Sequence, residues 1–146
     1  MTKARARSDM QPPFQVIQGP DVIKSSLPFT TAVRAGEFVF LSGMASASID
    51  GQLIPDTFEN EARRTFQNIG RSLKAAGLTF SNVVQARCYL ADQKDWDAHN
   101  RIYREFFTEP FPARTTLIGC VGNLIKYEVE VIAYAGKKIC RSETEF

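Results

Sequence analysis

Only two segments of this chain have the spacing of apolar residues that is typical of an amphipathic helix. We expect the first helix to begin at a cap on Asp56 or Thr57 and to stop at Gly77, and the second to begin at a cap on Asp92 or Asp95. The apolar stripe of the first helix consists of Phe58, Ala62, Phe66, Ile69, Leu73 and Ala76. Two helices cover only one face of a sheet, so the second face needs another partner to cover it.

The remaining periodic segments are predicted strands, at residues 14–18, 30–34, 37–42, 82–90, 113–120 and 127–135. Their order with the two helices predicts an α+β fold in a single domain, with both helices on one face of the sheet. Residues 38–41 are apolar at every position, and residues 131–134 are similar, so we expect these strands to be buried on both faces. A lone chain would expose that apolar surface, and we therefore predict a homo-oligomer with sheets packed against sheets.

The chain has 146 residues, which is the size of one domain. We expect residues 14–136 to form that domain, residues 1–13 to be a mobile basic tail, and residues 137–146 to be a C-terminal tail. The formal net charge is only +2, which argues against nucleic acid as a partner. No apolar run has the length of a membrane span and no signal core follows the basic start, so a cytoplasmic location is the default expectation.

The cysteine and histidine content limits the chemistry that this chain can perform. Three widely spaced cysteines argue against a disulfide framework and against a zinc site, so we expect reduced thiols and no metal. His99 is the only histidine, and we interpret it as an ordinary helix residue. Sequence motifs for nucleotide binding, zinc proteases and serine hydrolases are absent, and no cofactor is expected.

Arg114 stands at the start of a strongly apolar, β-like stretch and is the first candidate for a binding residue. A guanidinium group matches a carboxylate with two parallel hydrogen bonds, so a pocket built around Arg114 would select small organic acids. The alternative is an edge-strand arginine whose head lies in water. The sequence pattern alone leaves both interpretations open.

Glu128 and Glu130 alternate with valines in a predicted strand, so both carboxylates share one face of it. One interpretation is a solvent-facing edge. The other is a cleft at a subunit boundary, in which desolvation raises the pKa of a glutamate until it can transfer protons. Arg114 begins the neighbouring strand, and we therefore expect Arg114 and Glu128 to lie across one cavity.

Two further positions give weaker signals. Ser42 and Gly43 end the apolar hairpin strand, where a glycine lets a ligand approach the backbone closely. Asn100 shares a helix face with Trp96 and Tyr103, and an amide in such a place is either a satisfied core group or a polar lining residue.

Several motifs recur, in order, across residues 14–135 and together resemble the YjgF/RidA family. They are Pro28-Phe29, Leu41-Ser42-Gly43, Lys74-Ala75-Ala76-Gly77-Leu78, residues 100–107, Phe111-Pro112-Ala113-Arg114 and residues 128–133. The resemblance implies a chorismate-mutase-like α+β fold and a homotrimer with three clefts between subunits. It also implies hydrolysis of enamines and 2-imino acids, such as those formed from 2-aminoacrylate, to 2-keto acids and ammonia.

The resemblance assigns roles to individual residues of this chain. It implies that Arg114 binds the substrate carboxylate and that Glu128 acts on the hydrolytic water. The backbones of Gly43 and Thr116 match ligand-contacting positions, and Asn100 matches a polar residue near the cleft.

This chain departs from the family pattern at two site positions. Phe29 stands where the family usually has tyrosine, and Thr116 stands where many members have cysteine. These departures leave open a larger enamine acid, from aromatic or pyrimidine catabolism, as the substrate. Two other hypotheses are a non-catalytic binder of small carboxylates and an endoribonuclease, the latter disfavoured by the near-neutral charge and the single histidine.

Overall fold

The computed structural model describes residues 11–137, and within them a single mixed sheet is covered by two α-helices. The elements in chain order are β1 (Gln15–Val16), β2 (Ala32–Ala35), β3 (Phe38–Leu41), β4 (Met44–Ala45), α1 (Phe58–Ala75), β5 (Val83–Leu90), α2 (Trp96–Phe106), β6 (Ala113–Ile118) and β7 (Tyr127–Tyr134), with short 3₁₀ helices at Phe80–Asn82 and Gln93–Asp95. Most of the N-terminal tail and nearly all of the C-terminal tail expected from the sequence lie outside the described residues.

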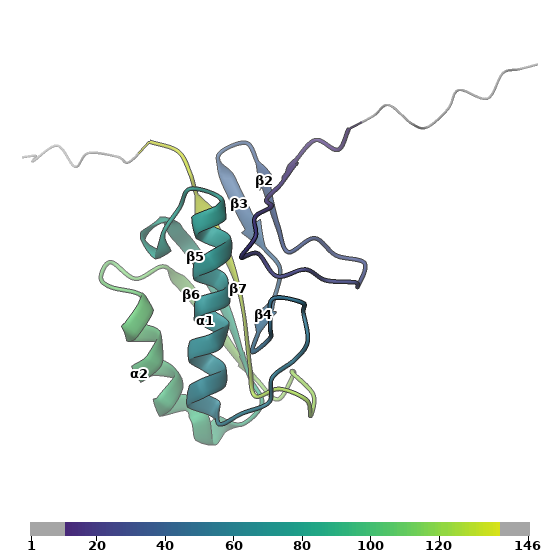
Figure 1. Cartoon of the computed structure of the whole chain (residues 1–146). Coiled ribbons are helices and arrows are strands. Elements are labelled where there is room, and N and C mark those ends of the chain that lie inside the picture. The colour runs from purple at the N-terminus through teal and green to yellow at the C-terminus, as the bar shows by residue number, and fades with distance from the viewer. Residues whose placement is uncertain (1–10, 138–146) are drawn as a thin grey trace, which may run out of the picture.

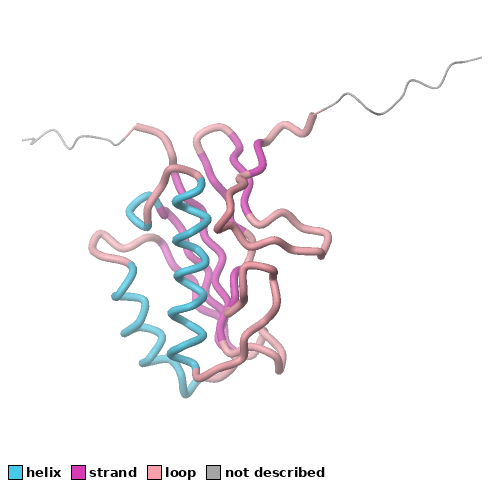
Figure 2. Tube along the Cα trace, in the orientation of Figure 1, coloured by secondary structure: helices cyan, strands magenta, loops and turns pink. Residues whose placement is uncertain are grey.

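The strand order in the sheet is β1-β2-β3-β7-β5-β6, and β4 pairs with β7 beyond the end of β3. Every pairing is antiparallel except that of β5 with β6, which is parallel. Figure 1 shows both helices in front of the sheet, and the tube in Figure 2 shows the strands together behind them. The predicted α+β fold, with two helices on one face of a mixed sheet, is confirmed.

Helix α1 buries the apolar stripe that its sequence predicts. Ala62, Phe66, Ile69 and Leu73 have no exposed surface. The helix is capped by Thr57, whose hydroxyl accepts a hydrogen bond from the backbone N–H of Asn60 at 3.3 Å. Gly77 follows the helix with φ at +75°, a conformation that glycine adopts without steric cost.

Aromatic rings join the two helices to each other and to the sheet. Phe66 of α1 stacks on Phe106 at a centroid distance of 4.8 Å and meets Tyr103 edge-on at 5.9 Å. It also lies 5.8 Å from the ring of Tyr127 on β7. These contacts fix α2 over the strands β5 and β6, and thereby place the residues of α2 beside Arg114.

The structure corrects one expectation about the strands and leaves another untested. Within the single chain, β3 buries Val39 and Leu41 and exposes Phe38 and Phe40 at 43% and 40%, so burial of its second face depends on the predicted assembly. Strand β6 pairs with β5 and not with β7, so Arg114 does not lie on the strand beside Glu128. The short strand β4 comes just before the loop that the sequence indicated from residue 46.

Within residues 11–137, neither α1 nor α2 combines the length and the apolar content that a transmembrane helix requires.

Candidate active site

Arg114 lies on the helix-covered face of the sheet, at its edge. β6 is the last strand of the sheet, and Arg114 is in register with Ala86, which is fully buried beneath the helices. The guanidinium Nη2 donates to Oδ1 of Asn100 at 2.8 Å, and the guanidinium carbon lies 4.8 Å from the centroid of the Tyr103 ring. No carboxylate within residues 11–137 forms an ion pair with Arg114. The charge is thus oriented by an amide and an aromatic ring, and remains free to bind an anion.

A cavity of about 240 Å³ opens beside this guanidinium, and we call it the Arg114 cavity. Its lining residues are Asn100, Tyr103, Arg104, Phe111, Pro112 and Arg114. Tyr103 is buried, and its hydroxyl has no hydrogen-bond partner among the described residues. The cavity combines cationic and amide groups with apolar walls, which is the composition of a site for a small organic acid.

His99 connects α2 to the strands β6 and β7 through hydrogen bonds of its imidazole ring. Its imidazole is fully buried, with Nδ1 2.8 Å from the hydroxyl of Tyr127 and Nε2 3.3 Å from Oγ1 of Thr116. Burial, and secondarily the charge of Arg114, lower the pKa of His99 to about 4, so the ring is neutral at neutral pH. The Thr116 side chain therefore points into the protein toward His99, which leaves its backbone as the part suited to contact a ligand.

Glu128 lies on the opposite face of the sheet. Its neighbours in β7, Tyr127 and Val129, are fully buried toward the helices, so Glu128 and Glu130 project from the uncovered face as the alternation predicted. The Glu128 carboxylate packs against Gly43, where the Cβ of any other residue would overlap it. Desolvation, reinforced by the charge of Glu130, raises the pKa of Glu128.

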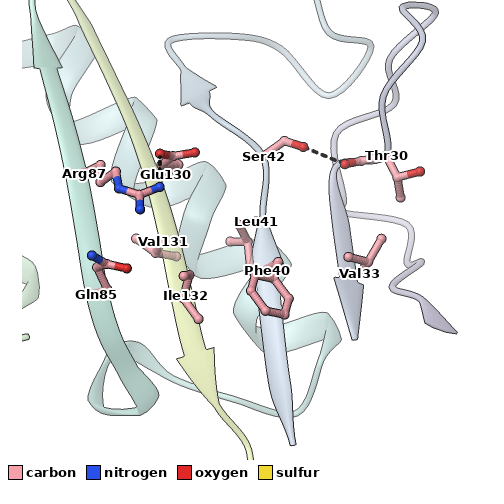
Figure 3. Close-up of a pocket in the computed structure, with 10 residues that line it drawn as sticks. All are labelled: Thr30, Val33, Phe40, Leu41, Ser42, Gln85, Arg87, Glu130, Val131 and Ile132. Atoms are coloured by element: carbon pink, nitrogen blue, oxygen red, sulfur yellow. Dashed lines mark hydrogen bonds and ion pairs between the residues drawn. The ribbon is translucent and has the colours of Figure 1, made fainter. Parts of the chain in front are cut away.

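The two glutamates differ in their partners, and this distinguishes their roles. Glu130 forms an ion pair with Arg87 at 3.0 Å and accepts a hydrogen bond from the Tyr89 hydroxyl at 2.9 Å. Figure 3 shows Glu130 turned toward Arg87 in a hollow of about 260 Å³ on the uncovered face. The Glu128 side chain has neither an ion pair nor a hydrogen bond with any described residue. Glu128 is therefore the carboxylate that is available to act on a ligand or a water molecule.

Ser42 precedes Gly43 and is joined by hydrogen bonds to the segment that follows Phe29. The Ser42 hydroxyl donates to the carbonyl of Thr30 at 2.7 Å, as Figure 3 shows, and the Ser42 N–H donates to the carbonyl of Thr31 at 2.9 Å. These bonds tie the segment that carries Phe29 to the end of β3. We refer to Phe29, Ser42, Gly43 and Glu128 as the Glu128 group.

The structure thus gathers the predicted site residues into two groups and not one. Asn100, Arg114 and Thr116 lie on the helix-covered face at the β6 edge, and the Glu128 group lies on or beside the uncovered face. Strand β5 separates β6 from β7. Within one chain, Arg114 and Glu128 do not line a common cavity, and the cavity that they are expected to share stays a prediction for the assembly.

His99 was missed as a site residue by sequence reasoning. No spacing in the sequence links His99 to Thr116 and Tyr127, since the three residues come from α2, β6 and β7. The one signal for His99 in the sequence was its position beside the candidate Asn100, on a helix with few polar groups on the side that faces the sheet.

Comparisons with known proteins identify the family and the fold of this chain. The family described as Endoribonuclease L-PSP matches residues 20–135. The 2-iminobutanoate/2-iminopropanoate deaminase of Capra hircus is 37% identical over 111 residues, covering 75% of this chain and 81% of the relative, and that of Homo sapiens is 33% identical over 111 residues, covering 75% and 81%. The crystal structure of RidA from an Antarctic Psychrobacter bacterium superposes with a TM-score of 0.76 at 26% identity, covering 82% of this chain and 98% of that one.

Proposed function

The chain belongs to the YjgF/RidA family, and we propose that it hydrolyses 2-imino acids to 2-keto acids and ammonia in clefts between its subunits. Relatives that are 33% to 37% identical to it are named 2-iminobutanoate/2-iminopropanoate deaminases. Those names favour a deaminase over a non-catalytic binder or an endoribonuclease. The observation that carries the proposal is a pair of oppositely charged side chains, Arg114 and Glu128, that lack ionic partners among the described residues.

Arg114 binds the carboxylate of the substrate in this proposal. Asn100 and Tyr103 hold its guanidinium in one orientation, so little conformational entropy is lost when the carboxylate docks. The fork can then donate two parallel hydrogen bonds, which fixes the direction in which the adjacent imine carbon points.

Glu128 supplies the acid–base chemistry. With its pKa raised, the carboxylate is a better proton acceptor than an ordinary glutamate and can take a proton from a water molecule. The water oxygen bonds to the electrophilic carbon of the protonated imine (iminium) and gives a neutral tetrahedral carbinolamine. The proton that Glu128 holds then passes to the nitrogen, the C–N bond breaks, ammonia leaves, and release of the hydroxyl proton to water gives the keto acid. Backbone groups of Gly43 and Thr116 complete the binding of substrate and water.

The exposed apolar residues on the uncovered face of the sheet support an assembly in which each site is shared between two subunits. Phe38, Phe40 and Leu117 are exposed at 43%, 40% and 50%, and the strand pairings place all three on the same face as Glu128. Packing this face against a second copy would cover the apolar surface. We propose a homotrimer in which the Arg114 cavity of one subunit faces the Glu128 group of the next, located in the cytoplasm.

The test couples a threonine dehydratase to the purified protein and follows the release of 2-ketobutanoate and ammonia. Arg114→Ala should lower kcat/KM about a hundredfold, because a desolvated carboxylate loses its partner. Arg114→Lys should recover only part of the loss, since an ammonium lacks the planar fork. Glu128→Gln should lower kcat more than it raises KM, because the amide cannot accept the proton.

Glu130→Gln is the matched control, because Glu130 lies on the same strand face but is already paired with Arg87. It should keep most of the activity. Size-exclusion chromatography should show the same oligomer for every variant. Near-full activity of an assembled Arg114→Ala protein would refute the proposed function.

A further inference from the structure

The Arg114 cavity contains a second guanidinium, that of Arg104 in the last turn of α2. None of the residues that line the cavity is acidic. The cavity therefore contains two positive charges, although one would suffice to bind the single carboxylate of a simple imino acid.

Asn100 connects the two arginines. Its side-chain oxygen accepts from Nη2 of Arg114 at 2.8 Å, and its backbone carbonyl accepts from Nη1 of Arg104 at 3.1 Å. Both guanidinium groups are thus held by one residue and lie close to each other. Each keeps further N–H donors that can bind a ligand.

Three other arginines of the helices are paired with acids, whereas Arg71 donates to the side-chain oxygen of Asn68. Arg63 pairs with Glu105 at 2.7 Å, Arg64 with Asp56 at 3.3 Å and Arg101 with Glu59 at 3.9 Å. Within residues 11–137, Arg104 and Arg114 have no ionic partner. Two neighbouring cations that repel each other are stabilised when an anion with two charges lies between them.

On the basis of the proposed imine hydrolysis, we infer that the site prefers dianionic imino acids, with Arg114 binding the carboxylate beside the imine carbon and Arg104 binding a second carboxylate at the far end of the side chain. The cavity volume of about 240 Å³ fits a short-chain dicarboxylate. Tyr103, Phe111 and Pro112 supply apolar walls for the carbon atoms between the two charges. The reaction is unchanged: one water is added, and a keto diacid and ammonia are released.

The experiment compares two imines made in solution. 2-Iminosuccinate is generated from aspartate by an aspartate oxidase, and 2-iminopropanoate from alanine by an amino-acid oxidase. Keto-acid release is measured for the wild-type protein, for Arg104→Gln and for Arg101→Gln. Arg101 is the matched control, because it lies on the same helix but is paired with Glu59 and does not line the cavity.

The wild-type protein should have the higher kcat/KM for iminosuccinate. Arg104→Gln should lower the ratio of the two kcat/KM values, dianion over monoanion, by about tenfold, the effect of losing one charge-assisted pair. Arg101→Gln should leave both values unchanged. Succinate should inhibit the wild-type protein more strongly than butanoate, and Arg104→Gln should remove that difference.

An unchanged ratio in Arg104→Gln would overturn the inference, while hydrolysis of iminopropanoate by the wild-type protein would leave the proposed function standing. An equal loss of kcat/KM for both imines in Arg104→Gln would also overturn the inference, since Arg104 would then act on the structure and not on the second carboxylate. Hydrolysis of neither imine by the wild-type protein would refute the proposed function and the inference with it.

Discussion

Arg114 and Glu128 point to opposite faces of the same sheet. Arg114 is in register with Ala86, which is buried under the helices, whereas Glu128 is in register with Tyr89, three residues further along β5 and on the other face. Side chains alternate along a strand, so an odd separation places them on different faces. Within a single chain, the sheet itself and strand β5 therefore separate the two charges.

This geometry predicts complementation between two inactive proteins. Arg114→Ala and Glu128→Ala subunits, unfolded together and refolded at equal amounts, should form some clefts that have an intact Arg114 from one subunit and an intact Glu128 from the next. With random mixing, about one quarter of the clefts in a closed ring are intact, so about a quarter of wild-type activity should return. The measurement is deaminase activity of the mixture against each variant refolded alone.

A matched mixture combines Arg114→Ala with an Arg114→Ala, Glu128→Ala double variant, which contains no intact Arg114 and should stay inactive. Absence of recovery in the first mixture, with mixed oligomers verified by mass spectrometry, would show that both residues of a site come from one chain.

A second prediction concerns the contact between Gly43 and Glu128. Gly43 does not have a positive φ, so alanine is allowed there by the backbone, and only the Glu128 carboxylate obstructs a Cβ. Gly43→Ala should lower the free energy of unfolding by about 1 kcal/mol, because the carboxylate is the flexible end of the Glu128 side chain and can turn away, and should reduce activity by displacing it. Urea unfolding at fixed protein concentration measures the first effect.

The same substitution in a Glu128→Ala background provides the control. Without the carboxylate, Gly43→Ala should change the free energy of unfolding by less than about 0.5 kcal/mol, so the two substitutions are coupled. If Gly43→Ala lowered the free energy of unfolding equally in both backgrounds, the Glu128 carboxylate would not be the group that excludes a side chain at position 43.

Local patterns predicted much of this fold. The stripe of α1, its cap and its glycine stop depend on residues within one helix, and the structure has all three. The alternation that places Glu128 and Glu130 on one face is likewise a property of a single strand. Such features follow from the period of each element and require no knowledge of its partners.

Strand pairing was the part that local patterns did not determine. The turn between β6 and β7 suggested that these two strands are neighbours in the sheet, but β5 pairs with both strands and lies between them. The parallel β5–β6 pair requires the crossover that α2 provides, and that choice depends on burying Phe66 against Tyr103 and Phe106. Arg114 and Glu128 were expected on neighbouring strands, whereas the fold places β5 between their strands and the two side chains on opposite faces. Their roles, and a cleft that they share between subunits, stay predictions.

The single histidine gives a third prediction, on pH. With the pKa of His99 lowered to about 4 in the folded protein and near 6.5 when unfolded, the unfolded chain takes up a proton first as the pH falls. The stability that this residue contributes is complete above pH 6.5 and is lost as the pH falls toward 4. The loss is on the order of 3 kcal/mol. Urea unfolding at pH 7 and pH 4.5 measures it.

His99→Gln is the comparison, because glutamine keeps hydrogen-bonding capacity but does not titrate. The variant should be less stable at pH 7 and should lose less stability between pH 7 and pH 4.5. NMR gives a direct check, since the chain has one histidine and hence one imidazole titration curve. A midpoint between pH 6 and 7 in the folded protein would contradict the buried, neutral ring.

A fourth prediction concerns Glu61, a buried acid that connects the start of α1 to the start of β7. Its carboxylate has no exposed surface and accepts hydrogen bonds from the backbone N–H of Asp56 at 3.0 Å and of Lys126 at 2.6 Å. The Lys126 ammonium lies 3.6 Å away. Glu61→Ala leaves both N–H groups without an acceptor, and we expect the free energy of unfolding to fall by about 3 kcal/mol.

Two other variants separate the contributions to this effect. Lys126→Met removes the ammonium, which is 46% exposed, but keeps the backbone N–H, and should cost at most about 1 kcal/mol. Glu59→Ala, two residues before Glu61 and paired only with exposed Arg101, should change the free energy of unfolding by less than about 0.5 kcal/mol. If Lys126→Met lowered the free energy of unfolding as much as Glu61→Ala, the ion pair and not the two backbone hydrogen bonds would hold β7 to α1.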